Sequence, residues 1–181
     1  MNWTFAGTNS FNTNINGWDV EEVVNMNNMF NGAIIFNQPL DHWKTYKVNT
    51  LSNTFQNAKA FNQELNNWDT SEVTNMRATF AGALEFNKDL DNWDTSKVTN
   101  MRDTFNGAAK FNKNLDDWDT SEVTDMLQTF QGAAKFNNGE AALVSNTLSW
   151  DVSKVRRTQA MFYNAAAFNS NLSDWDLGEV Y

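Results

Sequence analysis

Cysteine is absent from this chain, and proline and histidine each occur only once. The absence of cysteine excludes a disulfide framework and a cysteine zinc site. The single histidine, His42, leaves most nucleophilic mechanisms without a base, and no nucleophile-elbow pattern lies near it. The sequence therefore predicts a protein that is not an enzyme and that carries no cofactor or metal.

Long apolar runs are also missing, so we expect no membrane insertion in this segment. The sequence shows neither a signal peptide nor an anchor motif. Its 22 acidic residues outnumber its 13 basic ones and leave a formal net charge of −9. Nucleic-acid binding needs clustered lysine and arginine against phosphate, so nucleic acid is not an expected partner.

Repetition is what the chain has in abundance. A Phe–Asn pair begins at Phe11 and returns every 25 residues as far as Phe136, then once more at Phe168. A tryptophan follows each pair, and self-similarity at such a period is typical of a protein built from stacked units. The tryptophans are Trp18, Trp43, Trp68, Trp93, Trp118, Trp150 and Trp175.

One repeat, taken from Asp94 to Gly107, predicts a helix of about ten residues. Val98, Met101 and Phe105 are spaced by three and four residues, which places them on one helix face. Asp94 and the Thr-Ser pair after it are suitable N-caps, and Gly107 stands where a left-handed residue ends a helix. The equivalent stops are Gly7, Gly32, Asn57, Gly82, Gly132 and Asn164.

A short extended strand is predicted from Asn112 to Trp118. The predicted fold is therefore α/β: a right-handed solenoid of about seven 25-residue strand–turn–helix repeats, with a parallel sheet on one face. We expect equivalent side chains to stack from repeat to repeat, Phe on Phe, Trp on Trp and Met on Met.

No dedicated caps are visible at the ends, so residues 1–181 are interpreted as a single repeat domain from a longer array. Uncapped ends would expose apolar surface, which predicts end-to-end self-stacking. One repeat contains seven extra residues within 137–149, which we expect to bulge from the strand side. Such insertions are either neutral or lie on the binding face.

The second repeat departs from the pattern in a different way. Lys44 and Tyr46 stand where other repeats have Asp-Thr-Ser, and Pro39 and His42 belong to the same repeat. One interpretation is drift at a solvent-facing loop. The other is a local basic and aromatic patch on an otherwise acidic molecule.

The asparagine after each repeated phenylalanine never varies between copies. An amide both donates and accepts hydrogen bonds, so we predict a structural ladder. The tryptophans allow two arrangements: a buried column, if the backbone bends before each indole, or an exposed column. The large apolar patch that exposure would create favours burial. The ladder positions are Asn12, Asn37, Asn62, Asn87, Asn112, Asn137 and Asn169.

The run N-W-D-T-S-K-V-T-N-M-R-D-T-F-N-G-A-A-K-F-N resembles a repeat of about 25 residues in bacterial surface proteins and lipoproteins of the mycoplasma and Listeria type. That repeat looks related to BspA-like leucine-rich repeats, and the likeness covers essentially the whole chain. The resemblance implies a leucine-rich-repeat-like solenoid at the cell surface or outside the cell, with roles in adhesion or host interaction. It supplies no catalytic residues, and the copy from Lys44 to Tyr46 departs from it.

The favoured function is non-enzymatic recognition of a host or cell-surface protein or glycan through the strand face. A structural spacer or stalk is the alternative. A remote alternative is a hydrolase that uses a pair of carboxyl groups. Acids such as Asp116 and Asp119 recur at equivalent positions in most repeats, which fits caps and solvated faces better than one unique site. The candidate binding residues are Lys88, Asp91, Asn92, His42, Lys44 and Tyr46.

Overall fold

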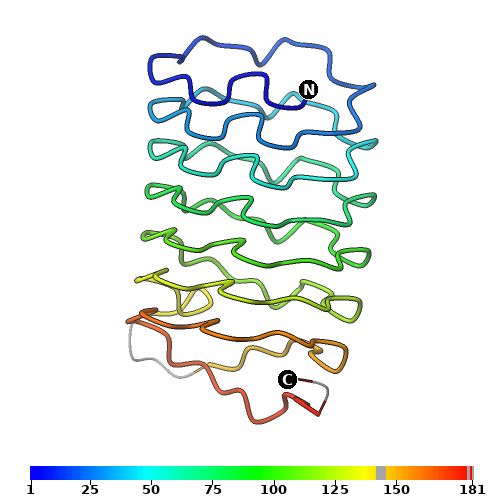
Figure 1. Ribbon diagram of the computed structural model, residues 1–181, viewed down its shortest axis with the longest axis vertical. Helices are drawn as coiled ribbons and strands as arrows, with labels where there is room; N and C mark the ends of the chain where they lie inside the picture. The colour runs from blue at the N-terminus through cyan, green and yellow to red at the C-terminus, as the bar shows by residue number, and fades with distance from the viewer. Residues whose placement is uncertain (142–145, 179, 181) are drawn as a thin grey trace.

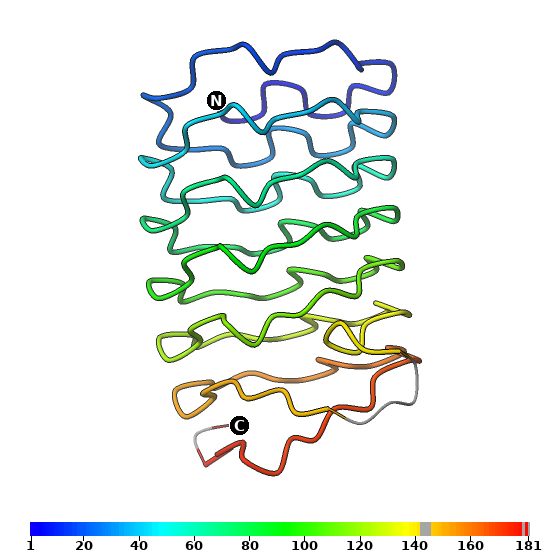
Figure 2. The ribbon, with the colours of Figure 1, turned by 180° about the vertical axis from the view of Figure 1, so that it is seen from behind.

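A computed structural model describes residues 1–141, 146–178 and 180. The chain winds as a stack of coils, where a coil is one complete circuit, and the termini lie at opposite ends of the stack (Figures 1 and 2). Equivalent residues of neighbouring coils form isolated parallel β-bridges, and one further bridge joins Thr147 to Asn171. The bridged column consists of Asn25, Thr50, Asn75, Asn100, Asp125 and Arg157.

The predicted α/β fold of strand–turn–helix repeats is wrong. The described residues contain no helix, and their strand pairing is limited to the isolated bridges. The chain therefore does not form a leucine-rich-repeat-like solenoid with a parallel sheet on one face. Successive turns occupy the segments that were expected to be helical.

A left-handed residue interrupts each expected helix near its middle. Asp103 has a φ of 58°, and Gly107 has a φ of 69°. An α-helix of L-residues cannot continue through a left-handed position. The left-handed conformation expected at the stops is confirmed, but the second left-handed position, four residues earlier, has no counterpart in the prediction. These earlier positions are Trp3, Asn28, Asn53, Ala78, Asp103, Gln128 and Ala160.

The backbone hydrogen bonds explain why turns replace the helix. The N–H groups of Met101, Asp103 and Phe105 donate at 2.9 Å to carbonyls in the next coil, as from Met101 to Asp125. Between them, Thr104 closes a tight turn by donating to the Met101 carbonyl at 3.1 Å. Successive turns point apolar side chains inward at intervals of three and four residues, so they imitate the spacing of a helix face.

The expected strand from Asn112 to Trp118 is held by other interactions. The Asn112 N–H donates to the side-chain Oδ1 of Asn87 at 2.9 Å, and the Trp118 N–H closes a turn onto the Leu115 carbonyl at 3.1 Å. A parallel strand needs an even ladder of backbone hydrogen bonds. Side-chain acceptors and turns take the place of that ladder here.

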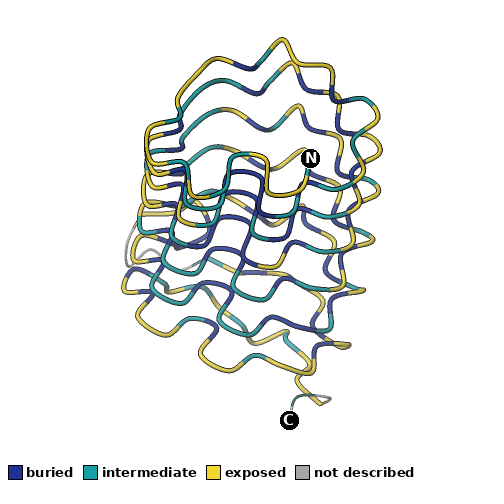
Figure 3. Ribbon diagram, turned by 45° about the horizontal axis from the view of Figure 1, so that its top comes forward, coloured by how far each residue is buried: buried dark blue, intermediate teal, exposed yellow. Residues whose placement is uncertain are grey.

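The interior consists of columns of like side chains that run along the stack, and buried positions recur at the same place in successive coils (Figure 3). Along one column, the centroid of the Phe80 ring lies 5.6 Å from that of the Phe55 ring and 5.6 Å from that of the Phe105 ring. The rings of Trp68 and Trp93 are 6.5 Å apart and nearly parallel, at 4°. The expected stacking of Phe on Phe and Trp on Trp is confirmed.

Burial of the tryptophan column is confirmed in the middle of the stack. Trp93 is 2% exposed, and its N–H closes a turn onto the Leu90 carbonyl that directs both side chains inward. Its Nε1 donates to the Leu65 carbonyl of the preceding coil at 3.0 Å. That bond satisfies the one polar group of the indole. Trp18, in the first coil, remains 43% exposed.

The described part of the insertion within 137–149 packs against the preceding coil. Asn138 is 3% exposed, its Oδ1 accepts from the Leu115 N–H at 2.9 Å, and its Nδ2 donates to the Asp116 carboxylate at 2.7 Å. These bonds tie the start of the insertion to the edge of its neighbour. Residues 142–145, which belong to the expected bulge, lie outside the described residues.

Candidate functional site

The predicted asparagine ladder positions are linked from coil to coil. The Asn62 N–H donates to Asn37 Oδ1 at 2.9 Å, and the Asn87 N–H donates to Asn62 Oδ1 at the same distance. Each side-chain oxygen thereby supplies the acceptor that a neighbouring strand would otherwise provide. The same bond links successive members of Asn12, Asn37, Asn62, Asn87, Asn112, Asn137 and Asn169.

A row of exposed charges alternates in sign from coil to coil. Its members pair across neighbouring coils at 2.5–2.6 Å. Exposed pairs of this kind contribute at most about 1 kcal/mol each, so the row shapes the surface more than the stability. The row consists of Glu22, Lys47, Glu72, Lys97, Glu122 and Lys154.

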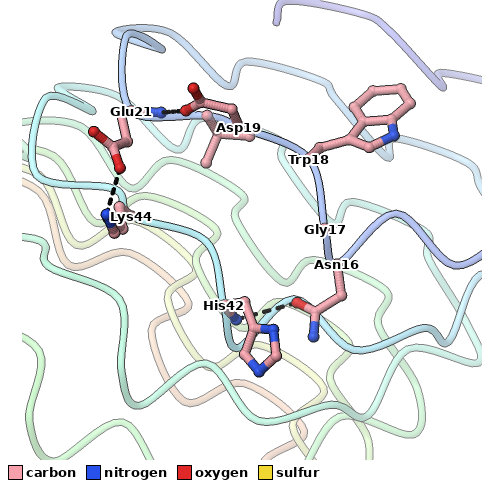
Figure 4. Close-up of a pocket in the computed structure, with 8 residues that line it drawn as sticks. Asn16, Gly17, Trp18, Asp19, Glu21, His42 and Lys44 are labelled. Atoms are coloured by element: carbon pink, nitrogen blue, oxygen red, sulfur yellow. Dashed lines mark hydrogen bonds and ion pairs between the residues drawn. The ribbon is translucent and has the colours of Figure 1, made fainter.

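A shallow hollow of about 210 Å³ lies between the first two coils (Figure 4). The Glu21 carboxylate accepts hydrogen bonds from Lys44 Nζ and, at 3.3 Å, from the Tyr46 hydroxyl. The hydrogen bond with Glu21, and secondly the negative charge of Glu21, raise the pKa of Lys44 above the ordinary 10.5. The His42 N–H donates to Asn16 Oδ1 at 3.1 Å on the other side of the hollow. Three candidate residues, His42, Lys44 and Tyr46, therefore lie close together.

Neighbouring carboxylates offset the positive charge at this hollow. Lys44 is paired with Glu21, and Lys47 is paired with Glu22 at 2.5 Å. Asp19 adds a further carboxylate to the lining. The surface near His42 is therefore a mixed ionic one, which differs from the basic patch considered above.

The other three candidate residues, Lys88, Asp91 and Asn92, do not line this hollow. Lys88 Nζ pairs with a Glu64 carboxylate oxygen at 2.8 Å. The Asn66 side chain donates to Asp91 Oδ1 at 2.6 Å and accepts from the Asn92 N–H at 3.0 Å. The six candidates thus fall into two groups on different coils.

A larger hollow of about 440 Å³ crosses several coils on the side of the left-handed residues. We call it the alanine groove, because Ala78, Ala81 and Gly82 line its centre. The coils on either side carry polar residues at the positions of the two alanines. These counterparts are Asn53 and Gln56 in the coil before, and Asp103 and Asn106 in the coil after.

The two alanines interrupt a polar network. Asn31 Nδ2 donates to Asn28 Oδ1 at 2.9 Å and to Gln56 Oε1 in the next coil at 3.0 Å. Asn106 Nδ2 likewise donates to Asp103 Oδ1 at 2.9 Å. Gln56 Nε2 borders the groove and has no hydrogen-bond partner among residues that the structure describes. A donor is therefore left available where the network stops.

Arg77 and Leu84 complete the groove. The Arg77 guanidinium forms no ion pair or hydrogen bond within the described ranges, whereas Arg102 Nε in the next coil donates to Asp103 at 3.1 Å. Leu84 is 39% exposed. Available donors, a carboxylate and an apolar edge are the combination that orients a polar ligand.

The sequence prediction missed this groove, because a search for chemically distinctive side chains passes over alanine. A signal was present nonetheless. Ala78 and Ala81 form the only pair at these two positions in which both residues are alanine. Two alanines between coils that carry polar residues at both positions mark the groove in the sequence.

Two carboxyl groups have clearly shifted pKa values, and both shifts are downward. The Ser96 hydroxyl and N–H lower the pKa of Asp94, and the Ser153 N–H and hydroxyl lower that of Asp151. A catalytic acid needs a shift in the opposite direction. Within the described ranges, no group of three or more acidic or histidine residues is placed to hold a metal ion. The same ranges hold no helix that could cross a membrane.

Comparison with known proteins gives one match. No curated protein and no solved structure matches the chain. One protein family matches residues 1–93, 62–146 and 80–181, and these overlapping matches span the whole sequence. They support a tandem-repeat protein of the mycoplasma type and give no support to the leucine-rich-repeat, lipoprotein or adhesion expectations. The chain belongs to the family described as "Mycoplasma protein of unknown function, DUF285".

Proposed function

We propose that this chain is a non-enzymatic recognition module, displayed at a cell surface, that binds a glycan in the alanine groove. The observation that carries the proposal is the interruption of the polar network at Ala78 and Ala81. In neighbouring coils the equivalent polar groups bond one another. At the groove, the alanines offer Gln56 Nε2 no partner, and Asp103 and Asn106 bond each other instead of a side chain of the coil before.

A glycan suits the chemistry of this lining. Sugar hydroxyls both donate and accept hydrogen bonds, so they complement the Gln56 amide, the Asp103 carboxylate and the Arg77 guanidinium. Leu84 offers an apolar edge to the C–H face of a sugar ring. The small side chains of Ala78 and Ala81 let a sugar ring approach the backbone.

Surface display and a relation to BspA-type surface proteins are parts of this proposal. They rest on the W-D-T-S-x-V-T-x-M motif, seen at Trp93 to Met101, and on its resemblance to a repeat of bacterial surface proteins. Protease treatment of intact cells that produce the protein tests its location. Cleavage of the protein in intact cells supports display, and protection until lysis contradicts it.

A filled-groove variant provides the sharpest binding test. Ala78→Asn with Ala81→Gln restores the pair found in the preceding coil. We expect this variant to be at least as stable as the parent, since Ala78 has a φ of 53° and asparagine tolerates that conformation better. The new amides would occupy the groove, and glycan affinity should fall by at least about tenfold, or about 1.4 kcal/mol.

Arrays of host and bacterial glycans identify the ligand, and calorimetry then measures its affinity. Arg77→Ala should weaken binding, while Arg156→Ala, an exposed arginine outside the groove, serves as the matched control. Failure to retain any glycan, or equal binding by the filled-groove variant, would overturn the proposal. Retention of a protein that depends on the same alanines would reassign the groove to protein recognition.

The structural spacer is the second candidate. The regular coil-to-coil hydrogen bonds and continuous core columns favour it, because they make a stiff rod without any ligand. For a spacer, substitutions in the alanine groove should leave every cellular phenotype unchanged. The filled-groove variant therefore separates the two functions in cells as well as in vitro.

A further inference from the structure

Most basic side chains of this chain already have a carboxylate partner. Nine of the 13 lysine and arginine residues form ion pairs, which leaves four. These four have no ion pair with any residue that the structure describes, and Arg77 is the one of them that lines the alanine groove. An unpaired cation in a hollow attracts an anion. The four are Lys59, Arg77, Lys135 and Arg156.

The residue that follows Arg77 explains why this arginine is unpaired. Arg102 stands at the equivalent position in the next coil, and its Nε donates to Asp103 Oδ2 at 3.1 Å. The residue after Arg77 is Ala78, which has no carboxylate to offer. Two neighbouring coils thus carry an arginine at the same position, and only one of the two has a counter-ion within its own coil.

The Asp103 carboxylate also lines the groove, but its charge is already offset. Its Oδ1 accepts from Asn106 Nδ2 at 2.9 Å, and its Oδ2 accepts from Arg102 Nε. The Asp103 side chain is only 15% exposed. Arg77, Arg102 and Asp103 together comprise two positive groups and one negative group, so this part of the groove keeps a positive excess.

The available groups of the groove suit an anion in their hydrogen bonding as well as in their charge. A guanidinium has five N–H donors and no acceptor, and an ionised carboxylate or sulfate group only accepts. Bonds between two such charged groups are about twice as strong as bonds between neutral ones. Because Arg77 is exposed, dissolved salt screens its charge. Attraction of an anion by Arg77 should therefore weaken as the salt concentration rises.

We propose that the alanine groove selects an acidic glycan, whose carboxylate or sulfate group is bound by the Arg77 guanidinium. This inference rests on the proposed function, which is glycan binding in the same groove. The anionic group of the sugar takes the place that Asp103 has beside Arg102, and which Ala78 leaves empty beside Arg77. The free Gln56 Nε2 donates to a further oxygen of the sugar.

Two variants of equal size separate charge from shape. Ala78→Asp gives Arg77 a counter-ion, while Ala78→Asn adds a side chain of the same shape without the charge. Both residue types occupy this left-handed position in neighbouring coils, as Asp103 with a φ of 58° and Asn53 with a φ of 56°, so both variants should fold. The probes are uronic-acid oligosaccharides with their carboxyl-reduced counterparts, and sulfated oligosaccharides with their desulfated counterparts. Calorimetry measures the affinity of each.

The parent chain should bind the acidic member of one kind of pair about tenfold more tightly than its neutral counterpart, and that pair identifies the anionic group. Ala78→Asp should lower the affinity for the acidic member about tenfold more than Ala78→Asn does, and the two variants should bind the neutral member equally. Salt raised from about 50 mM to about 500 mM should weaken the acidic member alone.

Arg77→Gln should abolish the preference for the acidic member. Arg156→Gln, at another unpaired and exposed arginine, should keep it. Equal binding of acidic and neutral members, or equal losses in the two Ala78 variants, would overturn this inference and leave glycan binding in place. Binding of neither member of any pair, together with an empty glycan array, would overturn the proposed function itself.

Discussion

Replacement of Trp93 by alanine tests the stacked core at its centre. The Trp93 ring is 2% exposed and lies 6.5 Å from the Trp68 ring and 6.4 Å from the Trp118 ring. Truncation of a buried tryptophan costs about 3–5 kcal/mol. The loss of Nε1 also removes a 3.0 Å hydrogen bond to the Leu65 carbonyl, and a buried unpaired group costs about 1–3 kcal/mol. Together these terms give an expected loss of about 4–8 kcal/mol in the free energy of unfolding.

Equilibrium unfolding in urea, followed by circular dichroism, measures this loss. Trp18→Ala is the matched control, because the same truncation at a 43% exposed indole should cost about 1 kcal/mol or less. Trp93→Phe keeps an aromatic ring but removes the donor, so its cost should fall between the two. A loss for Trp93→Ala no larger than that for Trp18→Ala would refute the account of the column.

Two further predictions concern the turns. Gly82→Ala should lower the melting temperature more than Gly107→Ala, because an added Cβ at Gly82 meets Asn57 Oδ1 at 2.5 Å, while Gly107 has only ordinary contacts. Gly107→Ala should cost about 1–2 kcal/mol from its positive φ alone, and equal melting temperatures would contradict this reasoning. Hydrogen bonds from Ser96 hold the pKa of Asp94 below its ordinary 3.8, so the stability they confer is present above that pH and is lost as the pH falls through the lowered value. The stability difference between the parent and Asp94→Asn should therefore shrink in acid, and a difference that stays constant between about pH 7 and about pH 2 would argue against this cause.

The left-handed stops could be predicted from the sequence, but the structure between them could not. Gly107 and its equivalents mark a left-handed conformation because glycine and asparagine adopt it at low cost. The other left-handed position carries no such marker: Trp3, Ala78 and Gln128 all occupy it. Tertiary hydrogen bonds override the local preference at these positions. The sequence therefore shows one of the two breaks in each expected helix.

Periodicity was ambiguous for a related reason. Val98, Met101 and Phe105 have the spacing of a helix face, and stacked turns produce the same spacing. The difference lies in where the N–H groups go. In a helix they bond four residues back, whereas here Met101 and Phe105 bond to the next coil. That choice depends on residues more than 20 positions away, which a local pattern does not contain.

The site was predictable only where unusual residues marked it. His42, Lys44 and Tyr46 stand out from their repeat; His42 and Lys44 line one hollow, and the Tyr46 hydroxyl donates to Glu21, which also lines it. The alanine groove arises from missing side chains, so it is visible only by comparing equivalent positions. Lys88 was selected from an expected strand face, and that face does not exist in this fold.

In each coil, different positions hold the stack together and shape the alanine groove. This separation suggests how the groove acquires specificity for a ligand. Backbone bonds and inward-facing columns hold neighbouring coils together, and the backbone bonds form whatever side chain a position carries. The side chains at positions 78 and 81 take no part in those backbone bonds, so they can be exchanged at little cost to the stack. A large polar residue there extends the network, while alanine opens a groove bounded by Gln56 and Asp103. A single stack can thus carry differently shaped grooves without any change of fold.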